Sequence, residues 1–168
     1  VETIHSYTND QNLLDNYHKN MRRGRSAPLN MVITDTGAAK AAAKAVPELQ
    51  GKLTANAIRV PTPNVSLAIL YLTVEKETTI EEINNIIFEA SVRGNFVEQI
   101  LFSNSTEFVS SDGIGEPYTS IYDSPAANIS ADGKSMVLYF WYDNEYGYTM
   151  QVIRLAKHIT NTSRYRYY

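Results

Sequence analysis

The sequence contains no cysteine among its 168 residues. This absence excludes a disulfide framework, a zinc–thiolate site and a thiol nucleophile supplied by this chain. No apolar run approaches the roughly 20 residues that a membrane-spanning helix needs, so we expect no membrane partner. The 15 lysines and arginines stand against 18 acidic residues, and a net charge of −3 argues against a general nucleic-acid binder. No acidic or histidine cluster has the spacing of metal ligands, so no metal site is expected.

The length of the chain is enough for one domain with a substantial apolar core, because 43% of the residues are hydrophobic. The chain begins at Val1 inside a β-rich segment, with no cap or polar stretch before it. We therefore expect it to be part of a longer protein. We place one domain at residues 1–160 and a tail rich in tyrosine and arginine at residues 161–168.

Hydrophobic periodicity and turn residues predict a mixture of strands and helices. A long polar loop is expected at residues 9–30. Because strands outnumber helices and include a hairpin, the predicted fold class is α+β, with a mixed, largely antiparallel sheet and helices on one face. Strands are predicted at 1–5, 53–60, 65–74, 127–130 and 135–142, with short strands within 106–123, and helices at 36–46, 79–93 and 148–159.

Local signals mark several boundaries of these elements. Thr79 begins a Thr-Ile-Glu-Glu capping box, and Asp132-Gly133 is a strong hairpin turn. Thr36 is the expected N-cap of the first helix, whose free N–H groups follow a basic loop in an arrangement that often binds phosphate. The side chains of the last helix expected to face inward are Val152, Ala156 and Ile159.

Three kinds of polar side chain are candidates for function. His5 ends the first strand at a polar loop, where an imidazole is either a general base or a structural histidine. Arg23 and Arg25 in the long loop, and Arg59 at a strand end, either bind a doubly charged phosphate jointly or form a solvated charged surface. Asn144 follows a hydrophobic strand and offers both a donor and an acceptor, which suits a carboxamide ligand.

Four segments occur in an order that resembles a known family. They are HSYTNDQ at residues 5–11, TGAAK at 36–40, RVPTPNVS at 59–66 and WYDNEYGY at 141–148. Together they resemble the C-terminal catalytic domain of phosphorylating glyceraldehyde-3-phosphate dehydrogenase, over nearly the whole chain. In that family a cysteine thiolate attacks the aldehyde, a hydride passes to NAD, and phosphate cleaves the resulting thioester to an acyl phosphate.

The resemblance implies a role for each matching side chain. His5 would polarise the thiol and accept the hydroxyl proton as the hydride leaves. Residues 7–28 resemble a loop that lines the neighbouring subunit's cofactor site and the interface of a homotetramer. The remaining assignments are Thr8, Asp10 and Arg59 for the substrate phosphate, Arg23, Thr36 and Gly37 for inorganic phosphate, and Asn144 and Tyr148 for the nicotinamide of NAD.

The resemblance also implies partners and a setting. They are a small phosphorylated aldehyde, inorganic phosphate, NAD, an N-terminal NAD-binding domain and further copies of the chain, in a cytoplasmic enzyme of glycolysis. The family's cysteine and its NAD-binding domain precede the position of His5 and are not in this sequence. We therefore expect the chain alone to be inactive and to self-associate through surfaces that the first domain would cover.

Two alternatives stay open at this point. The chain could instead be a non-catalytic binding or assembly module, as the absence of a thiol and the unusual tail at residues 161–168 suggest. Among enzymes, an erythrose-4-phosphate dehydrogenase domain is the other interpretation, because its phosphate pockets would look similar.

Overall fold

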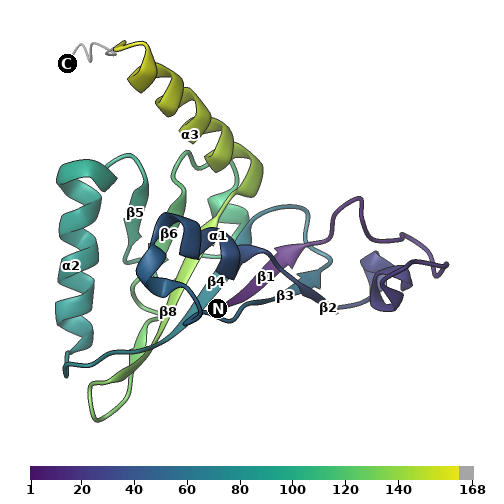
Figure 1. Cartoon of the computed structure of the whole chain (residues 1–168), viewed down its shortest axis with the longest axis horizontal. Coiled ribbons are helices and arrows are strands. Elements are labelled where there is room, and N and C mark those ends of the chain that lie inside the picture. Colours follow the sequence, from purple (N-terminus) through teal and green to yellow (C-terminus); the bar gives the residue numbers. More distant parts are fainter. Residues whose placement is uncertain (163–168) are drawn as a thin grey trace.

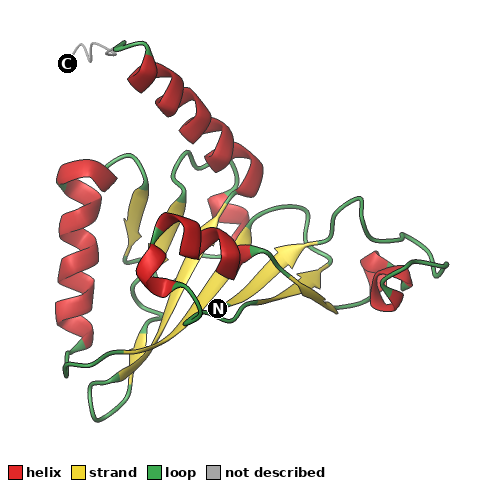
Figure 2. Ribbon diagram, in the orientation of Figure 1, coloured by secondary structure: helices red, strands yellow, loops and turns green. Residues whose placement is uncertain are grey.

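A mixed eight-stranded sheet forms the body of the molecule in the computed structural model, which describes residues 1–162 (Figures 1 and 2). The strands are β1 (Glu2–Ser6), β2 (Val32–Asp35), β3 (Asn56–Val60), β4 (Ser66–Thr73), β5 (Ile100–Ser103), β6 (Ser120–Asp123), β7 (Asn128–Ile129) and β8 (Ser135–Tyr142). The α-helices are α1 (Ala38–Ala45), α2 (Ile80–Val92) and α3 (Asn144–Ile159). Five short 3-10 helices are η1 (Met21–Gly24), η2 (Ala27–Leu29), η3 (Pro47–Leu49), η4 (Gly94–Phe96) and η5 (Ser110–Gly113).

The strand order is β2-β3-β1-β4-β8-β6-β5, and β7 pairs with β8 outside this path. The pairs β1–β3 and β5–β6 are parallel, and all other pairs are antiparallel. The predicted α+β class with a mixed, largely antiparallel sheet is therefore confirmed. The parallel pairing of β1 with β3 matters most for function, because it places two chain segments about fifty residues apart side by side.

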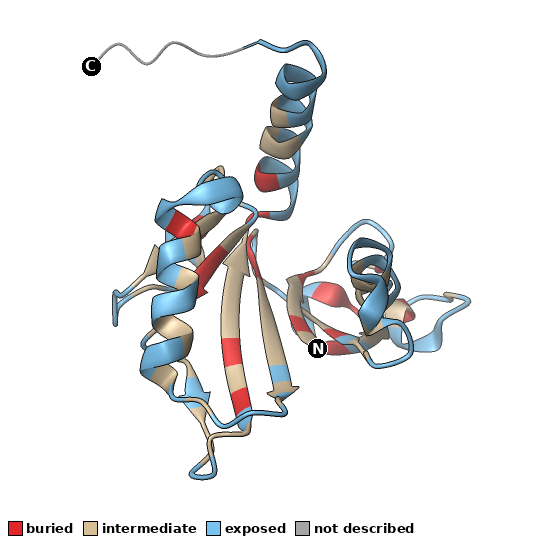
Figure 3. Cartoon of the chain, turned by 60° about the vertical axis from the view of Figure 1, so that its left-hand side comes forward, coloured by how far each residue is buried: buried red, intermediate tan, exposed pale blue. Residues whose placement is uncertain are grey.

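The core lies between α2 and the sheet (Figure 3). Tyr122, Met136 and Leu138 are almost fully buried, and Ile83 and Ile87 of α2 pack against them. The helix begins as the sequence predicts, since Thr79 Oγ1 accepts from the Glu82 N–H at 3.2 Å and the Glu82 carboxylate accepts from the Thr79 N–H at 3.2 Å. This capping box satisfies two of the N–H groups that a helix start leaves free.

The predicted hairpin is also confirmed, with β7 and β8 joined across Asp132-Gly133. Gly133 adopts a φ of +67°, and the Asp132 carboxylate accepts from the Lys134 N–H at 3.0 Å. A side chain at position 133 would be strained and would also lie 2.7 Å from the Thr78 carbonyl oxygen. The turn therefore requires glycine for two reasons.

Several predicted boundaries are wrong. Strands β2 and β5 were not predicted, β3 begins at Asn56 rather than at residue 53, and within 106–123 only β6 is a strand. Gly37 rather than Thr36 is the N-cap of α1. These elements are short, and their formation depends on pairing with distant segments more than on local sequence.

The last helix differs most from expectation. It begins at Asn144 instead of residue 148 and extends away from the sheet (Figure 1). Of the side chains predicted to face inward, Val152 is 49% exposed, Ile159 is 74% exposed, and Ala156 is also exposed. The tail at residues 163–168 lies outside the described residues.

Candidate active site

His5 and Arg59 meet where β1 and β3 run in parallel. The two residues are partners in the strand register, and their side chains share one face of the sheet. Arg59 Nη1 donates to the Ser6 carbonyl oxygen at 2.9 Å, and His5 Nδ1 lies 2.7 Å from the same oxygen. The Ser6 carbonyl only accepts and requires a proton on Nδ1, whereas Arg59 Nη1 only donates, lies 2.8 Å from Nδ1 and requires a lone pair there. Both contacts involve Nδ1, so Nε2 is the ring nitrogen left without a hydrogen bond within residues 1–162.

The surroundings of His5 favour a neutral imidazole. Burial is the largest effect and lowers the pKa of His5, and the positive charge of Arg59 lowers it further. The hydrogen bond with Ser6 and the negative charge of Glu145 raise this pKa but do not compensate. A neutral imidazole has a lone pair on one ring nitrogen and is a competent proton acceptor.

Arg59 is a half-buried cation with another cation nearby. Burial lowers the pKa of Arg59, the charge of Arg23 lowers it further, and Tyr142 and Asp10 act in the opposite direction. Arginine side chains are not deprotonated in proteins, so both groups are cations. Two like charges in one region form a favourable site for a dianion, which would relieve their repulsion.

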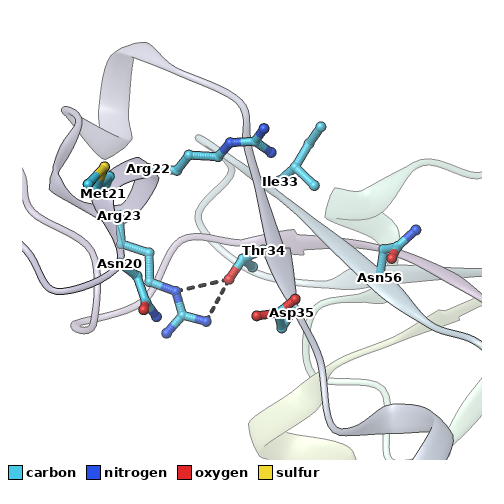
Figure 4. Close-up of a pocket in the computed structure, with 8 residues that line it drawn as sticks. All are labelled: Asn20, Met21, Arg22, Arg23, Ile33, Thr34, Asp35 and Asn56. Atoms are coloured by element: carbon cyan, nitrogen blue, oxygen red, sulfur yellow. Dashed lines mark hydrogen bonds between the residues drawn. The ribbon is translucent and has the colours of Figure 1, made fainter.

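Arg23, in η1, is held from two sides. Its Nε and Nη2 donate to Thr34 Oγ1 at 2.9 and 2.6 Å (Figure 4), and its Nη1 donates to the Asp10 carboxylate in the loop after β1. Partial desolvation raises the pKa of Asp10, but the hydrogen bonds and charges of Arg23 and His18 outweigh it and hold that pKa below its usual value. Arg23 is thus anchored between the loop and β2.

A cavity of about 280 Å³ lies beside these contacts, between η1 and the edge strand β2 (Figure 4). Arg23 is the only lining residue that the sequence assigned to the site, and its partner Thr34 also lines the cavity. The lining residues are Asn20, Met21, Arg22, Arg23, Ile33, Thr34, Asp35 and Asn56.

Thr36 and Gly37 follow Thr34 along the chain, after Asp35. Strand β2 ends at Asp35, so Thr36 and Gly37 lie where the chain enters α1. Thr36 Oγ1 accepts from the Ala38 N–H at 3.2 Å, and a Cβ atom added to Gly37 would meet no atom within 4 Å. Strand β2 therefore joins Thr34, which accepts from Arg23, to the start of α1. The space beside Gly37 is open.

Asn144 and Tyr148 lie in the first turns of α3, and both are exposed. The preceding residue, Asp143, is buried and fixes this start: its carboxylate accepts from Tyr146 N–H, Asn64 Nδ2 and Gly115 N–H at 3.0, 2.9 and 3.0 Å. Because the charge of Glu145 acts on His5, the first turn of α3 belongs to the same region of the molecule. Asn144 is thus a helix residue rather than a strand-end residue.

Thr8 remains outside this set of contacts in the described part of the chain. It is exposed, and its carbonyl accepts from the Gln11 N–H at 3.0 Å as part of the loop turn. Sequence reasoning missed Thr34 and Glu145. Thr34 lies in an unpredicted strand, and Glu145 lies in an unpredicted first turn, so no local pattern pointed to either side chain.

None of the helices among residues 1–162 is long and apolar enough to cross a membrane. Within the same residues, no group of three or more histidine, aspartate or glutamate side chains could hold a metal ion.

The family model for the glyceraldehyde 3-phosphate dehydrogenase C-terminal domain matches residues 1–144. A glyceraldehyde-3-phosphate dehydrogenase-like protein of Pseudomonas aeruginosa is 59% identical over 157 residues, which is 94% of this chain and 34% of that protein. The glyceraldehyde-3-phosphate dehydrogenase of Geobacillus stearothermophilus is 45% identical over 161 residues, or 96% of this chain and 47% of its own length. Glyceraldehyde-3-phosphate dehydrogenase 2 of Synechocystis is 44% identical over 94% of this chain and 46% of its own length. The chain thus spans between a third and a half of these relatives.

Proposed function

The chain belongs to the glyceraldehyde-3-phosphate dehydrogenase family, as a C-terminal domain, and we propose that it supplies the base and the anion-binding groups of the whole enzyme. The reaction is the NAD-dependent, phosphorylating oxidation of glyceraldehyde 3-phosphate to 1,3-bisphosphoglycerate in glycolysis. The observation that carries this proposal is the contact between the Nδ1 side of His5 and Arg59, which leaves a neutral imidazole beside a cation.

In this proposal His5 moves protons through Nε2. It takes the proton of an incoming thiol, which this cysteine-free chain does not supply, and gives it to the carbonyl oxygen as the hemithioacetal forms. The neutral ring then accepts the hydroxyl proton as the hydride departs. The contacts of Nδ1 with Ser6 and Arg59 hold the ring in place, so Nε2 is the nitrogen presented to the reaction. Arg59 and Arg23 neutralise phosphate charge, with Thr36 and Gly37 adding the N–H groups of a helix start.

The exposed groups on α3 fit a nicotinamide. The Asn144 side chain and the Tyr148 ring are exposed and have no hydrogen bond or ring contact within residues 1–162, so both are free to contact a ligand. An asparagine amide pairs with a carboxamide through one donor and one acceptor, and a tyrosine face packs on a flat ring. NAD, when bound, supplies the hydride acceptor.

Two surfaces suit the partners of the proposed enzyme. The first is α3, on which Leu155 is 58% and Ile159 is 74% exposed, and we assign it to the NAD-binding domain. The second is the sheet face opposite α2, where Tyr71 and Ile33 are exposed, and we assign it to further copies of the chain. An apolar surface on each of two sides supports a domain that works within a larger, homo-oligomeric assembly.

A chimera tests the proposal. The NAD-binding domain of the Geobacillus stearothermophilus relative, joined to this chain, should oxidise glyceraldehyde 3-phosphate with NAD and phosphate. His5→Gln should lower kcat about 100- to 10,000-fold. Lys76→Gln, on the exposed loop between β4 and α2, is the control that introduces the same side chain elsewhere and should leave kcat unchanged.

Other outcomes would contradict parts of the proposal. Turnover by the 168-residue chain alone would show that no outside thiol is needed. A folded but inactive chimera would contradict the dehydrogenase function. A kcat/KM higher with erythrose 4-phosphate than with glyceraldehyde 3-phosphate would identify erythrose 4-phosphate as the substrate. The names of the relatives support glyceraldehyde 3-phosphate over erythrose 4-phosphate, and a dehydrogenase over an assembly module.

A further inference from the structure

The Asp10 carboxylate lies between two side chains of the same loop. His18 Nε2 is 3.5 Å from Asp10 Oδ1, and Arg23 Nη1 donates to Oδ2. Asp10 is half exposed, whereas the His18 side chain is 15% exposed. Each oxygen of the carboxylate therefore faces a nitrogen of this loop.

The two ring nitrogens of His18 face different partners. Nδ1 lies against the backbone of Asn20, 2.9 Å from its N–H nitrogen and 3.1 Å from its carbonyl oxygen, whereas Nε2 faces Asp10. The Asn20 carbonyl in turn accepts from the Arg23 N–H at 2.8 Å, at the start of η1. One short turn thus connects the backbones that carry the histidine and the arginine.

Close packing around Gly24 fixes the position of His18. A Cβ atom at Gly24 would lie 2.4 Å from the Asn16 carbonyl oxygen and 3.3 Å from His18 Cβ. The Asn16 N–H donates to the Gly24 carbonyl at 2.9 Å, and the Asn12 N–H donates to the Arg23 carbonyl at 3.0 Å. The histidine is therefore part of an ordered loop and not a freely moving surface side chain.

A carboxylate repels an anion, so Asp10 is poorly suited to bind phosphate directly. Its contacts give it a different use, because it holds one end of the Arg23 guanidinium while Thr34 holds the other. We propose that His18 is a positioning residue that fixes Asp10, and that Asp10 in turn orients Arg23 toward inorganic phosphate. This inference rests on the proposed function, in which Arg23 contributes to a phosphate site.

The 168-residue chain itself provides the test. In ¹⁵N NMR spectra, the Arg23 Nε–H signal reports the orientation of the guanidinium, and titration with inorganic phosphate reports binding. His18→Leu keeps the bulk of the side chain but removes both polar contacts. It should shift or broaden the Arg23 signal and weaken phosphate binding about tenfold, the scale for losing one hydrogen bond to a charged group.

Three further variants separate positioning from folding. His18→Gln, which restores a donor toward Asp10, should recover much of the lost affinity. Asp10→Asn, on an exposed side chain, should reproduce the loss even where His18→Leu fails to fold. His158→Leu, on the exposed end of α3, is the control for removal of a histidine and should change neither signal.

The two proposals fail in different ways. If neither His18→Leu nor Asp10→Asn changes the Arg23 signal, the positioning role is overturned, whether or not phosphate binds. If neither the Arg23 nor the Arg59 signal of the wild-type chain responds to phosphate, the phosphate site is overturned. An altered Arg23 signal in the variants would then still support the orientation of Arg23 by His18 and Asp10.

Discussion

Helices α2 and α3 both carry large apolar side chains, but the surroundings of the two helices are opposite. α2 lies on the sheet, with Ile83 and Ile87 packed against Tyr122, Met136 and Leu138. α3 is anchored at its first turn and through Arg154 and Gln151, which donate to the carbonyls of Asn95 and Glu98, while Leu155 and Ile159 remain exposed. The stability of the chain thus resides in α2 and the sheet, whereas α3 presents the site at one end and an open apolar surface along its length.

Removal of core side chains should produce the largest difference between the two helices. Leu138→Ala, under α2, should lower the free energy of unfolding by about 3 to 4 kcal/mol, because a buried leucine leaves both lost transfer energy and a cavity. Leu155→Ala, on α3, should change it by less than about 0.5 kcal/mol in this chain. Urea unfolding measures both values, and equal losses would show that α3 is as much a part of the fold as α2.

Removal of the helix caps should produce a smaller difference in stability, and here the change at α3 should cost more than the change at α2. Asp143→Ala should cost about 2 to 3 kcal/mol, since it removes a buried carboxylate that accepts from three donors and leaves Asn64 Nδ2 and Gly115 N–H without that partner. Thr79→Ala, at the exposed cap of α2, should cost about 1 kcal/mol. Thermal unfolding of both variants tests this order, and a larger loss for Thr79→Ala would contradict it.

The smallest expected effect is electrostatic and distinguishes the two first turns. Glu145 in α3 raises the pKa of His5, so Glu145→Gln should lower it further, whereas Glu81→Gln in the first turn of α2 should leave it unchanged. NMR titration of the His5 ring checks the direction. A rise in the His5 pKa in the Glu145 variant would contradict the placement of α3 at the site.

The same lowered pKa makes stability depend on pH. Below the ordinary histidine value of 6.5 the unfolded chain binds a proton at His5 that the folded chain does not. The contribution of the neutral ring to stability is therefore complete above pH 6.5 and declines as the pH falls through the folded pKa. His5→Gln should remove this part of the pH dependence in urea unfolding curves.

Local sequence predicted the elements whose signals are themselves local. The capping box at Thr79 and the turn at Asp132-Gly133 involve residues within a few positions of each other, and both formed as expected. The start of α3 could not be predicted in the same way, because its cap is stabilised by Asn64 and Gly115, which lie 79 and 28 residues away from Asp143. Strands β2 and β5, with four residues each, are similarly defined by their pairing.

The candidate site shows the same division. His5, Arg23 and Arg59 were named from their residue types and from the family motifs, but their roles stay predictions until the variants above are measured. The side chains that tune or hold them, Glu145, Thr34 and His18, carry no sequence pattern that marks them. Their importance comes from distances to partners that the chain brings together only after folding.

The sequence by itself determined the family, the fold class, the hairpin and α2, because residue identity and short spacing encode those features directly. The tertiary structure alone decided that His5 lies against Arg59, that Asp10 pairs with Arg23, and that α3 leaves its apolar side chains uncovered. The physical reason is the separation along the chain over which each kind of interaction acts. Propensity, capping and turn geometry act over a few residues, whereas burial, charge interactions and strand pairing act between segments that only the folded chain brings into contact.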